Sequence, residues 1–256
     1  MMIHYLKVPF LLIWRAWFYI LMFSTILLMA PVLLVLTTRE KYYPAFWKVI
    51  RGWSFVLVYG MGFRLHIERE EYIKKNKSYL FIANHASLID PWIMIILSKN
   101  PIVFVGKKEL VKIPVFGFFY RKVVIMVDRE SDKSRKQVYQ RAKQKLTDVM
   151  SIGIFPEGLV PEEKIVLSPF KNGAFSLAIE FKTPIVPQIY FDCKRYFSWN
   201  IFKGGPGVIR IKQAYFIETE DKEIKDRKIL RDQVYDLIFH ELNTDEKYMN
   251  DTLKST

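Results

Sequence analysis

The pattern of apolar and charged positions divides the chain into two unequal parts. Residues 16–38 contain no charge, and a helix over residues 17–36 would be about 30 Å long, the thickness of bilayer hydrocarbon. A second apolar stretch at 52–63 is too short to cross a membrane alone. We therefore predict a membrane-associated hydrophobic helical hairpin over residues 1–63 and an α/β domain over residues 64–256.

Three interpretations of the hairpin are open. Arg15 lies among aromatic residues, Pro31 would kink the helix, and a second apolar stretch follows at 52–63, which favours an interfacial or re-entrant hairpin over a spanning helix. Charges flank the first apolar run on both sides and set no clear orientation. Two core helices of a soluble protein fit less well, because apolar residues surround the first helix instead of forming one stripe. A cleaved signal sequence is not expected, since the run exceeds about 15 residues and no small-residue cleavage site follows.

Downstream, short apolar strands alternate with helical patterns. Strands are predicted at residues 79–83, 102–105, 123–127, 152–155 and 185–190, helices at 91–97, 131–150 and 221–242, a hairpin turn at 204–207 and a frayed end at 244–256. This alternation predicts an α/β fold, with a largely parallel sheet flanked by helices.

Composition narrows the class of partner. The formal net charge is +13, and hydrophobic residues make up 51% of the chain, so an acidic lipid surface fits better than nucleic acid, for which no recognised module is present. Cys193 is the only cysteine, which excludes an internal disulfide and agrees with a cytosol-facing protein. The four histidines have no metal-binding spacing, so we predict neither a metal nor a cofactor.

The clearest chemical pattern is the box at residues 84–90, directly after a predicted strand. On a continuous helix His85 and Asp90 would be about 140° apart, so a contact between them requires a turn. Asp90 followed by Pro91 is typical of a helix N-cap with proline at the first helical position, which leaves the preceding residues free to curl. Taken alone, this box leaves two structural interpretations open. Asp90 could serve only as a helix cap, and His85 could be a polar residue at the end of a strand.

Further boxes follow in a fixed order. Phe155, Pro156, Glu157 and Gly158 come after another predicted strand, and Lys171 opens the run KNGA. With the 84–90 box, the run 107–129 and the pair at 186–187, they resemble the glycerolipid acyltransferases, the family of the bacterial 1-acylglycerol-3-phosphate acyltransferases. A single HxxxxD match is common by chance, whereas four boxes in this order are specific.

The resemblance implies a glycerol-3-phosphate acyltransferase-like fold and an O-acyltransferase at the cytoplasmic face of a membrane, the inner membrane in a bacterium. It implies transfer of a fatty acyl group from coenzyme A or acyl carrier protein to a lysophospholipid, foremost 1-acylglycerol-3-phosphate, giving phosphatidic acid. His85, made more basic by Asp90, would accept the proton of the attacking alcohol. Direct attack is favoured because Cys193 lies in no His-adjacent motif, and backbone amides near the turn are candidate oxyanion donors.

The resemblance also assigns residues to the acceptor, with a structural or positioning role for Ser87. These substrate-binding candidates are Asn84, Ser87, Lys107, Arg129, Phe155, Pro156, Glu157, Gly158 and Lys171. A tight turn after a strand is the alternative for the FPEG box.

The chain departs from the family after the FPEG box. Family members commonly continue with Thr-Arg-Ser, whereas Leu159, Val160 and Pro161 follow here, so an arginine suited to a bidentate phosphate contact is missing. Either another cation supplies that charge, or the acceptor headgroup is unusual; the candidate cations are Lys107, Lys108, Arg129 and Lys171. The alternatives are a lyso-aminolipid or another lysophospholipid as acceptor, and a noncatalytic lipid-binding protein.

Overall fold

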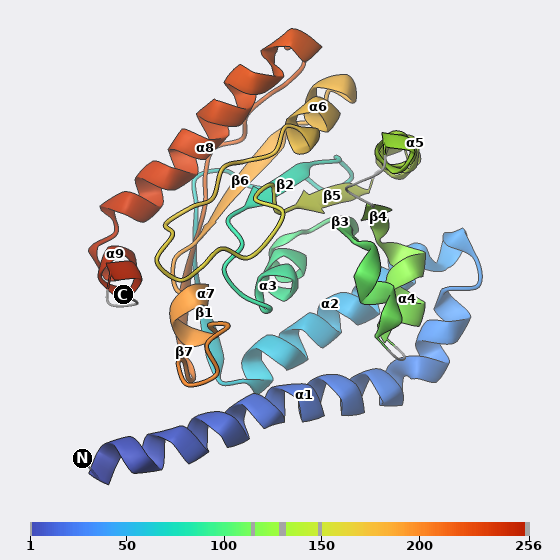
Figure 1. The fold of residues 1–256 in the computed structure, drawn as a ribbon. Helices are drawn as coiled ribbons and strands as arrows, with labels where there is room; N and C mark the ends of the chain where they lie inside the picture. The colour runs from blue at the N-terminus through green and yellow to red at the C-terminus, as the bar shows by residue number, and fades with distance from the viewer. Residues whose placement is uncertain (1, 114–115, 128–131, 148–149, 254–256) are drawn as a thin grey trace.

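A computed structural model of the chain describes residues 2–113, 116–127, 132–147 and 150–253. Within them, a seven-stranded sheet lies between two groups of helices (Figure 1). The strands are β1 (Phe63–Arg69), β2 (Leu80–Ala83), β3 (Ile102–Lys107), β4 (Ile125–Val127), β5 (Ser151–Ile154), β6 (Ile185–Tyr190) and β7 (Gly207–Gln213). The α-helices are α1 (Met2–Leu36), α2 (Tyr43–Gly60), α3 (Asp90–Leu97), α4 (Phe116–Val123), α5 (Asp132–Thr147), α6 (Gly173–Glu180), α7 (Cys193–Tyr196), α8 (Arg227–Thr244) and α9 (Glu246–Leu253). Three 3-10 helices among the described residues are η1 (Glu40–Tyr42), η2 (Lys108–Lys112) and η3 (Ile224–Asp226).

The strand order is β1-β7-β6-β2-β5-β3-β4, and every neighbouring pair is parallel except β6 and β7. The expected largely parallel sheet is therefore confirmed. β2 lies at the centre, with Ile82 opposite Ile154 of β5 and Pro187 of β6. All four residues of β2 are buried, as are those of β5, which explains why Ser151 is the only polar residue in these two strands.

Helices cover both faces of the sheet. On one face, side chains of α5, α6 and α8, such as Ala142, Ala178 and Val234, share a buried cluster with the strands. On the other face, a second cluster joins the strands to α3, α2 and α1, with α1 outermost (Figure 1). The carboxyl edge of the central strands therefore opens beside the N-terminal helices.

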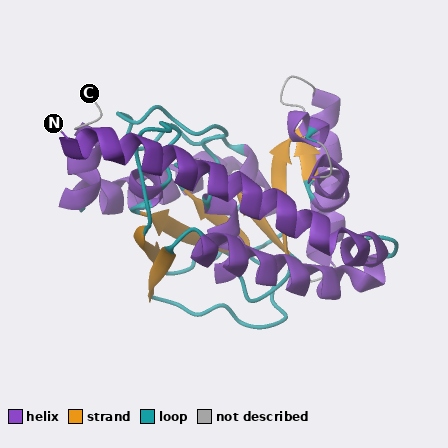
Figure 2. Ribbon diagram, turned by 90° about the horizontal axis from the view of Figure 1, so that it is seen from below, coloured by secondary structure: helices purple, strands orange, loops and turns teal. Residues whose placement is uncertain are grey.

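α1 and α2 form the expected helical hairpin and lie side by side (Figure 2). α1 contains one segment, Val8–Leu36, that is long and apolar enough to cross a membrane by length and composition. One side of α1 buries Trp14 and Phe18 against the rest of the molecule, whereas Ile13 and Leu28 on its other side are 71% and 81% exposed. One side of α1 therefore packs against the protein and the other side is exposed, although both sides carry apolar residues.

Arg15 is a charged residue within this apolar helix, and its contacts explain its position there. Its guanidinium donates hydrogen bonds to the carbonyl oxygens of Asn200 (3.1 Å) and Lys203 (2.8 Å) and lies 4.4 Å from the ring centroid of Phe197. The arginine therefore points into the protein and fastens α1 to the loop that follows α7.

Several boundaries differ from those predicted. The second helix of the hairpin begins at residue 43, with Pro44 in its first turn, and Pro31 lies inside α1. Phe63 already belongs to β1, which pairs with β7 over its whole length. The division into residues 1–63 and 64–256 stays a prediction.

Other elements were predicted wrongly or not at all. Val123 ends α4, so β4 is shorter than expected, and α7 lies between β6 and β7, so the glycines at 204–207 do not form a tight hairpin. Residues 244–256 were expected to fray, and this prediction is wrong for residues 246–253, which form α9. There α9 buries Tyr248, and the neighbouring Met249 packs against the same apolar cluster.

Candidate active site

The sequence boxes meet because the strands that precede them are neighbours. β2, β5 and β6 run parallel side by side, so the loops after them leave the sheet at the same edge. His85 follows β2, Glu157 follows β5 and Lys194 follows β6. Residues far apart in the sequence thus reach one place.

Asp90 lies at the centre of the turn formed by residues 84–90. Its Oδ2 accepts hydrogen bonds from Nδ1 of His85 (2.9 Å) and from the backbone N–H groups of Ala86 (2.7 Å) and Ser87 (2.8 Å). The expected contact between imidazole and carboxylate is therefore present. With a proton assigned to Nδ1, this contact leaves Nε2 of His85 as the basic nitrogen.

The predicted N-cap role of Asp90 is wrong. α3 begins at Asp90 itself, its N-cap residue is Ile89, and no side chain caps the helix. The carboxylate folds back onto the preceding turn instead, because two backbone amides and the imidazole surround it there. The amides of Ala86 and Ser87 are thus already occupied, which removes them as oxyanion donors.

Glu157 joins the loop after β5 to the loop after β2. It is 3% exposed, and its Oε1 accepts the backbone N–H of His85 (2.7 Å), while its Oε2 accepts that of Ser168 (2.8 Å). Burial raises the pKa of this carboxyl to about 7, and the two amide donors offset part of that effect. Glu157 therefore holds the backbone of His85, while Asp90 holds its ring.

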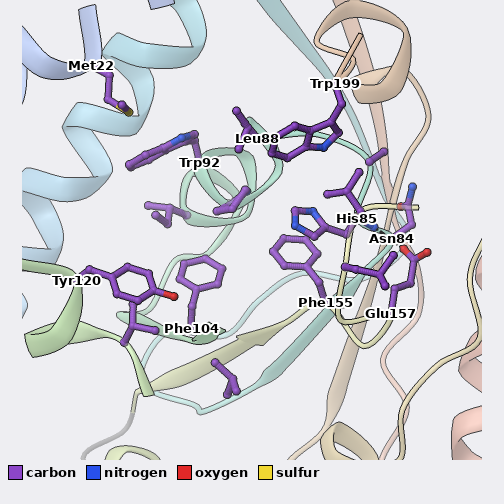
Figure 3. Close-up of a pocket in the computed structure, with 18 of the residues that line it drawn as sticks. Met22, Asn84, His85, Leu88, Trp92, Phe104, Tyr120, Phe155, Glu157 and Trp199 are labelled. Atoms are coloured by element: carbon purple, nitrogen blue, oxygen red, sulfur yellow. Dashed lines mark hydrogen bonds between the residues drawn. The ribbon is translucent and has the colours of Figure 1, made fainter. Parts of the chain in front are cut away.

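The imidazole also has an aromatic support. The ring of Phe155 stacks on that of His85, with centroids 4.3 Å apart and an angle of 20° between the planes. Trp199 lies on the other side of the imidazole (Figure 3). Stacking, the Asp90 contact and the Glu157 contact together fix the position of the ring.

His85 lines a cavity of about 1050 Å³ between the hairpin and the α/β part of the chain. The cavity continues from His85 past Phe104 and Trp92 toward Tyr120 and Met22 (Figure 3). Most of its lining is apolar and aromatic, and the hairpin contributes residues such as Phe18 and Trp53. Such a cavity is suited to a long apolar ligand next to the His85–Asp90 pair.

The remaining candidates lie in different positions. Asn84 lines the cavity, but its amide exchanges hydrogen bonds of 3.0 and 2.8 Å with the backbone of Tyr190 in β6. Ser87 is fully buried and donates to the carbonyl oxygen of Phe197 (2.7 Å), in agreement with a structural role. Gly158 lines the cavity with φ +77°, a conformation that favours glycine.

Other predicted residues contribute less to the cavity. The carbonyl oxygen of Pro156 accepts the backbone N–H of Lys171 (2.9 Å), and neither residue is part of the cavity lining. Lys108 and Lys171 are exposed. Arg129 lies outside the described residues, and of Lys107 only the backbone is described, at the end of β3.

Lys194 lines the cavity from α7 and was not among the predicted site residues. Its position just after β6 is the signal that would have found it, once β6 is known to lie beside β2. The neighbouring Cys193 is fully buried. Burial and the negative charge of Asp90 raise the pKa of its thiol well above the usual value, which opposes a covalent cysteine route.

Comparisons with known proteins identify relatives of this chain. A sequence model of the family described as Acyltransferase matches residues 64–190. The 1-acyl-sn-glycerol-3-phosphate acyltransferase of Limnanthes douglasii is 29% identical over 208 residues, covering 80% of this chain and 72% of that protein. The protein of that name from Saccharomyces cerevisiae is 28% identical over 212 residues, covering 79% and 69%.

The fold is shared with a solved structure. The crystal structure of the 1-acyl-sn-glycerophosphate acyltransferase of Thermotoga maritima superposes with a TM-score of 0.74 at 19% identity, covering 94% of this chain and 99% of that one. The human 1-acyl-sn-glycerol-3-phosphate acyltransferase alpha is 26% identical over 212 residues, covering 81% and 75%. The chain therefore belongs to the glycerolipid acyltransferase family that its sequence resembles, and it is an acyltransferase.

Proposed function

We propose that this acyltransferase moves a fatty acyl group from an acyl thioester to the free hydroxyl of 1-acylglycerol-3-phosphate, giving phosphatidic acid. The observation that carries the proposal is the His85–Asp90 pair on the wall of a large apolar cavity. The names of the relatives support the choice of acceptor.

In the proposed reaction, Nε2 of His85 accepts the proton of the acceptor hydroxyl while that oxygen attacks the thioester carbonyl carbon. The tetrahedral intermediate then expels the thiolate, which takes the proton from the imidazolium and leaves as the free thiol of coenzyme A or acyl carrier protein. Asp90 keeps the proton on Nδ1 and stabilises the imidazolium charge. A positioned base of this kind contributes about 10²–10⁴-fold to the rate.

The same proposal places the chain at a membrane. The exposed side of α1 carries large apolar residues, among them Ile13, Ile20 and Leu28, and the acceptor and product are membrane lipids. Because the other side of α1 packs on the protein along most of its length, we favour a helix lying in the cytoplasmic surface of the bilayer over one that crosses it.

A second candidate keeps the chemistry and changes the acceptor. Leu159, Val160 and Pro161 line the cavity where the family carries an arginine, and Glu162 and Glu163 line it directly after them. Carboxylates next to the headgroup would suit a cationic lyso-aminolipid.

Mass spectrometry of products separates these candidates. Purified full-length protein is mixed with acyl-CoA or acyl carrier protein as donor, and with 1-acylglycerol-3-phosphate, lysophosphatidylethanolamine, a phosphate-free lyso-aminolipid or monoacylglycerol as acceptor. We expect the fastest transfer to 1-acylglycerol-3-phosphate. Equal or faster transfer to an acceptor without a phosphate monoester would remove phosphatidic acid synthesis as the primary role, and vesicle binding without transfer to any acceptor would favour a noncatalytic protein.

A further inference from the structure

One basic side chain that lines the cavity beside His85 has no role in the proposed reaction. Among its described lining residues are three carboxylates, of Glu157, Glu162 and Glu163, and one lysine or arginine, Lys194. A phosphate monoester in this cavity needs a positive partner, since Leu159, Val160 and Pro161 supply none.

The carboxylates of the cavity have partners of their own. Glu163 accepts hydrogen bonds from the hydroxyl of Ser198 and, at 2.7 Å, from Nζ of Lys203. Glu162 lies 3.3 Å from Nζ of Lys164 at the surface. Both oxygens of Glu157 accept backbone amides, as described above. Their negative charges are thus partly neutralised without Lys194.

Lys194 itself contacts neutral groups. Its Nζ donates one hydrogen bond to the carbonyl oxygen of Ile165 (2.9 Å) and lies 5.6 Å from the ring centroid of Tyr248. An ammonium group has three N–H donors, so the one hydrogen bond that Lys194 donates to Ile165 leaves donor capacity for a ligand. Burial lowers the pKa of Lys194 to about 8, although the charges of Glu163 and Glu157 raise it in part. An anionic ligand would relieve that desolvation cost.

The backbone next to Lys194 is held in place. The buried carboxylate of Asp192 accepts hydrogen bonds from the backbone N–H, Nε and Nη2 of Arg210, at 2.9, 2.7 and 3.0 Å. Cys193, between Asp192 and Lys194 in the sequence, is fully buried. The start of α7 is therefore fixed, and the side chain of Lys194 leaves it from a defined point.

We infer that Lys194 binds the phosphate monoester of the acceptor and sets the preference of this chain for an anionic headgroup. The inference rests on the proposed function and deepens it. It replaces Lys108 and Lys171 as the source of charge, since these two residues are exposed and do not line the cavity.

Steady-state kinetics of three variants test the inference. Lys194→Gln removes the charge but keeps an amide donor for Ile165, and Lys194→Arg keeps the charge. Lys225→Met removes an exposed lysine that does not line the cavity. KM and kcat are measured with 1-oleoylglycerol-3-phosphate, together with KM for the donor and Ki for glycerol 3-phosphate, which has the headgroup without the acyl chain.

For Lys194→Gln we expect KM for the acceptor and Ki for glycerol 3-phosphate to rise about tenfold or more, because a charged hydrogen bond is lost. We expect kcat within about threefold of wild type, an unchanged donor KM, recovery of most of the loss in Lys194→Arg, and no change in Lys225→Met.

Two results for the Lys194→Gln variant would overturn the inference and leave acyl transfer standing. One is an unchanged acceptor KM and Ki in Lys194→Gln, and the other is an increase confined to the donor KM, which would assign Lys194 to the phosphates of coenzyme A. Wild-type transfer only to acceptors without a phosphate monoester would also overturn it. No transfer to any acceptor would overturn the proposed function and this inference together.

Discussion

The backbone N–H of His85 donates a 2.7 Å hydrogen bond to Oε1 of Glu157, a residue 72 positions later in the chain. This bond joins the two sequence boxes and assigns Glu157 to positioning His85, whereas the resemblance implies contact with the acceptor. Oε2 of the same carboxylate holds Ser168, so both oxygens are engaged with backbone amides.

Glu157→Gln tests this positioning role. Glutamine offers one carbonyl oxygen to two amide donors, so either His85 or Ser168 loses its partner. We expect kcat to fall about tenfold to a hundredfold with little change in acceptor KM, because a misplaced base slows the chemical step. A change confined to acceptor KM in steady-state kinetics would instead show that Glu157 binds the acceptor directly.

Glu157 also makes stability depend on pH. Its carboxyl has a pKa of about 7 in the folded protein against 4.5 ordinarily, so between these values the folded state binds more protons than the unfolded state. The free energy of unfolding therefore decreases as pH rises from about 4.5 to about 7, by on the order of 3 kcal/mol in total.

We expect Glu157→Gln to reduce the fall in Tm between about pH 5 and about pH 8 by about 5 °C or more. Differential scanning fluorimetry of both proteins in the same detergent measures this. Parallel Tm curves for wild type and variant would show that another group carries the pH dependence.

Asp90→Asn tests the orientation of the ring. Asparagine can still accept the amides of Ala86 and Ser87 through its carbonyl oxygen, but it lacks the charge that stabilises an imidazolium. We expect the single-turnover rate to fall about 10²-fold or more, with Tm within a few degrees of wild type. Retention of more than a third of the rate would remove Asp90 from the mechanism.

The buried thiol provides a test of direct attack. Cys193 is fully buried and its pKa is raised, so we expect no alkylation by iodoacetamide in the folded protein and no loss of activity on treatment. Intact-mass spectrometry before and after unfolding measures the labelling. Rapid labelling with inactivation would revive a covalent cysteine route.

Local patterns predicted much of this structure. The predicted strand at 185–190 coincides with β6, all six residues of which are buried and only one of which, Gln188, is polar. The contact between His85 and Asp90 was expected from a turn between them, and Pro91 does lie in the first turn of α3, although that helix begins at Asp90 itself. The sequence also identified the hairpin, although uniform hydrophobicity concealed which side of α1 faces the protein.

The long-range contacts could not be predicted. The roles of Glu157 and Lys194 depend on the order of strands β5, β2 and β6, which one sequence does not specify. The anchor at Tyr248 likewise depends on a distant partner, since its hydroxyl donates to the carbonyl oxygen of Val166 (2.8 Å). Residues positioned by neighbours in space leave no local periodicity to detect.

The measurement that tests the central claim most directly is kcat for acyl transfer by full-length His85→Ala, with 1-acylglycerol-3-phosphate and the active donor. The matched control is His66→Ala, an exposed histidine on β1. General-base catalysis by His85 predicts a loss of about 10²-fold or more, with Tm and vesicle binding retained and the control unaffected. A His85→Ala rate within threefold of wild type would contradict the account.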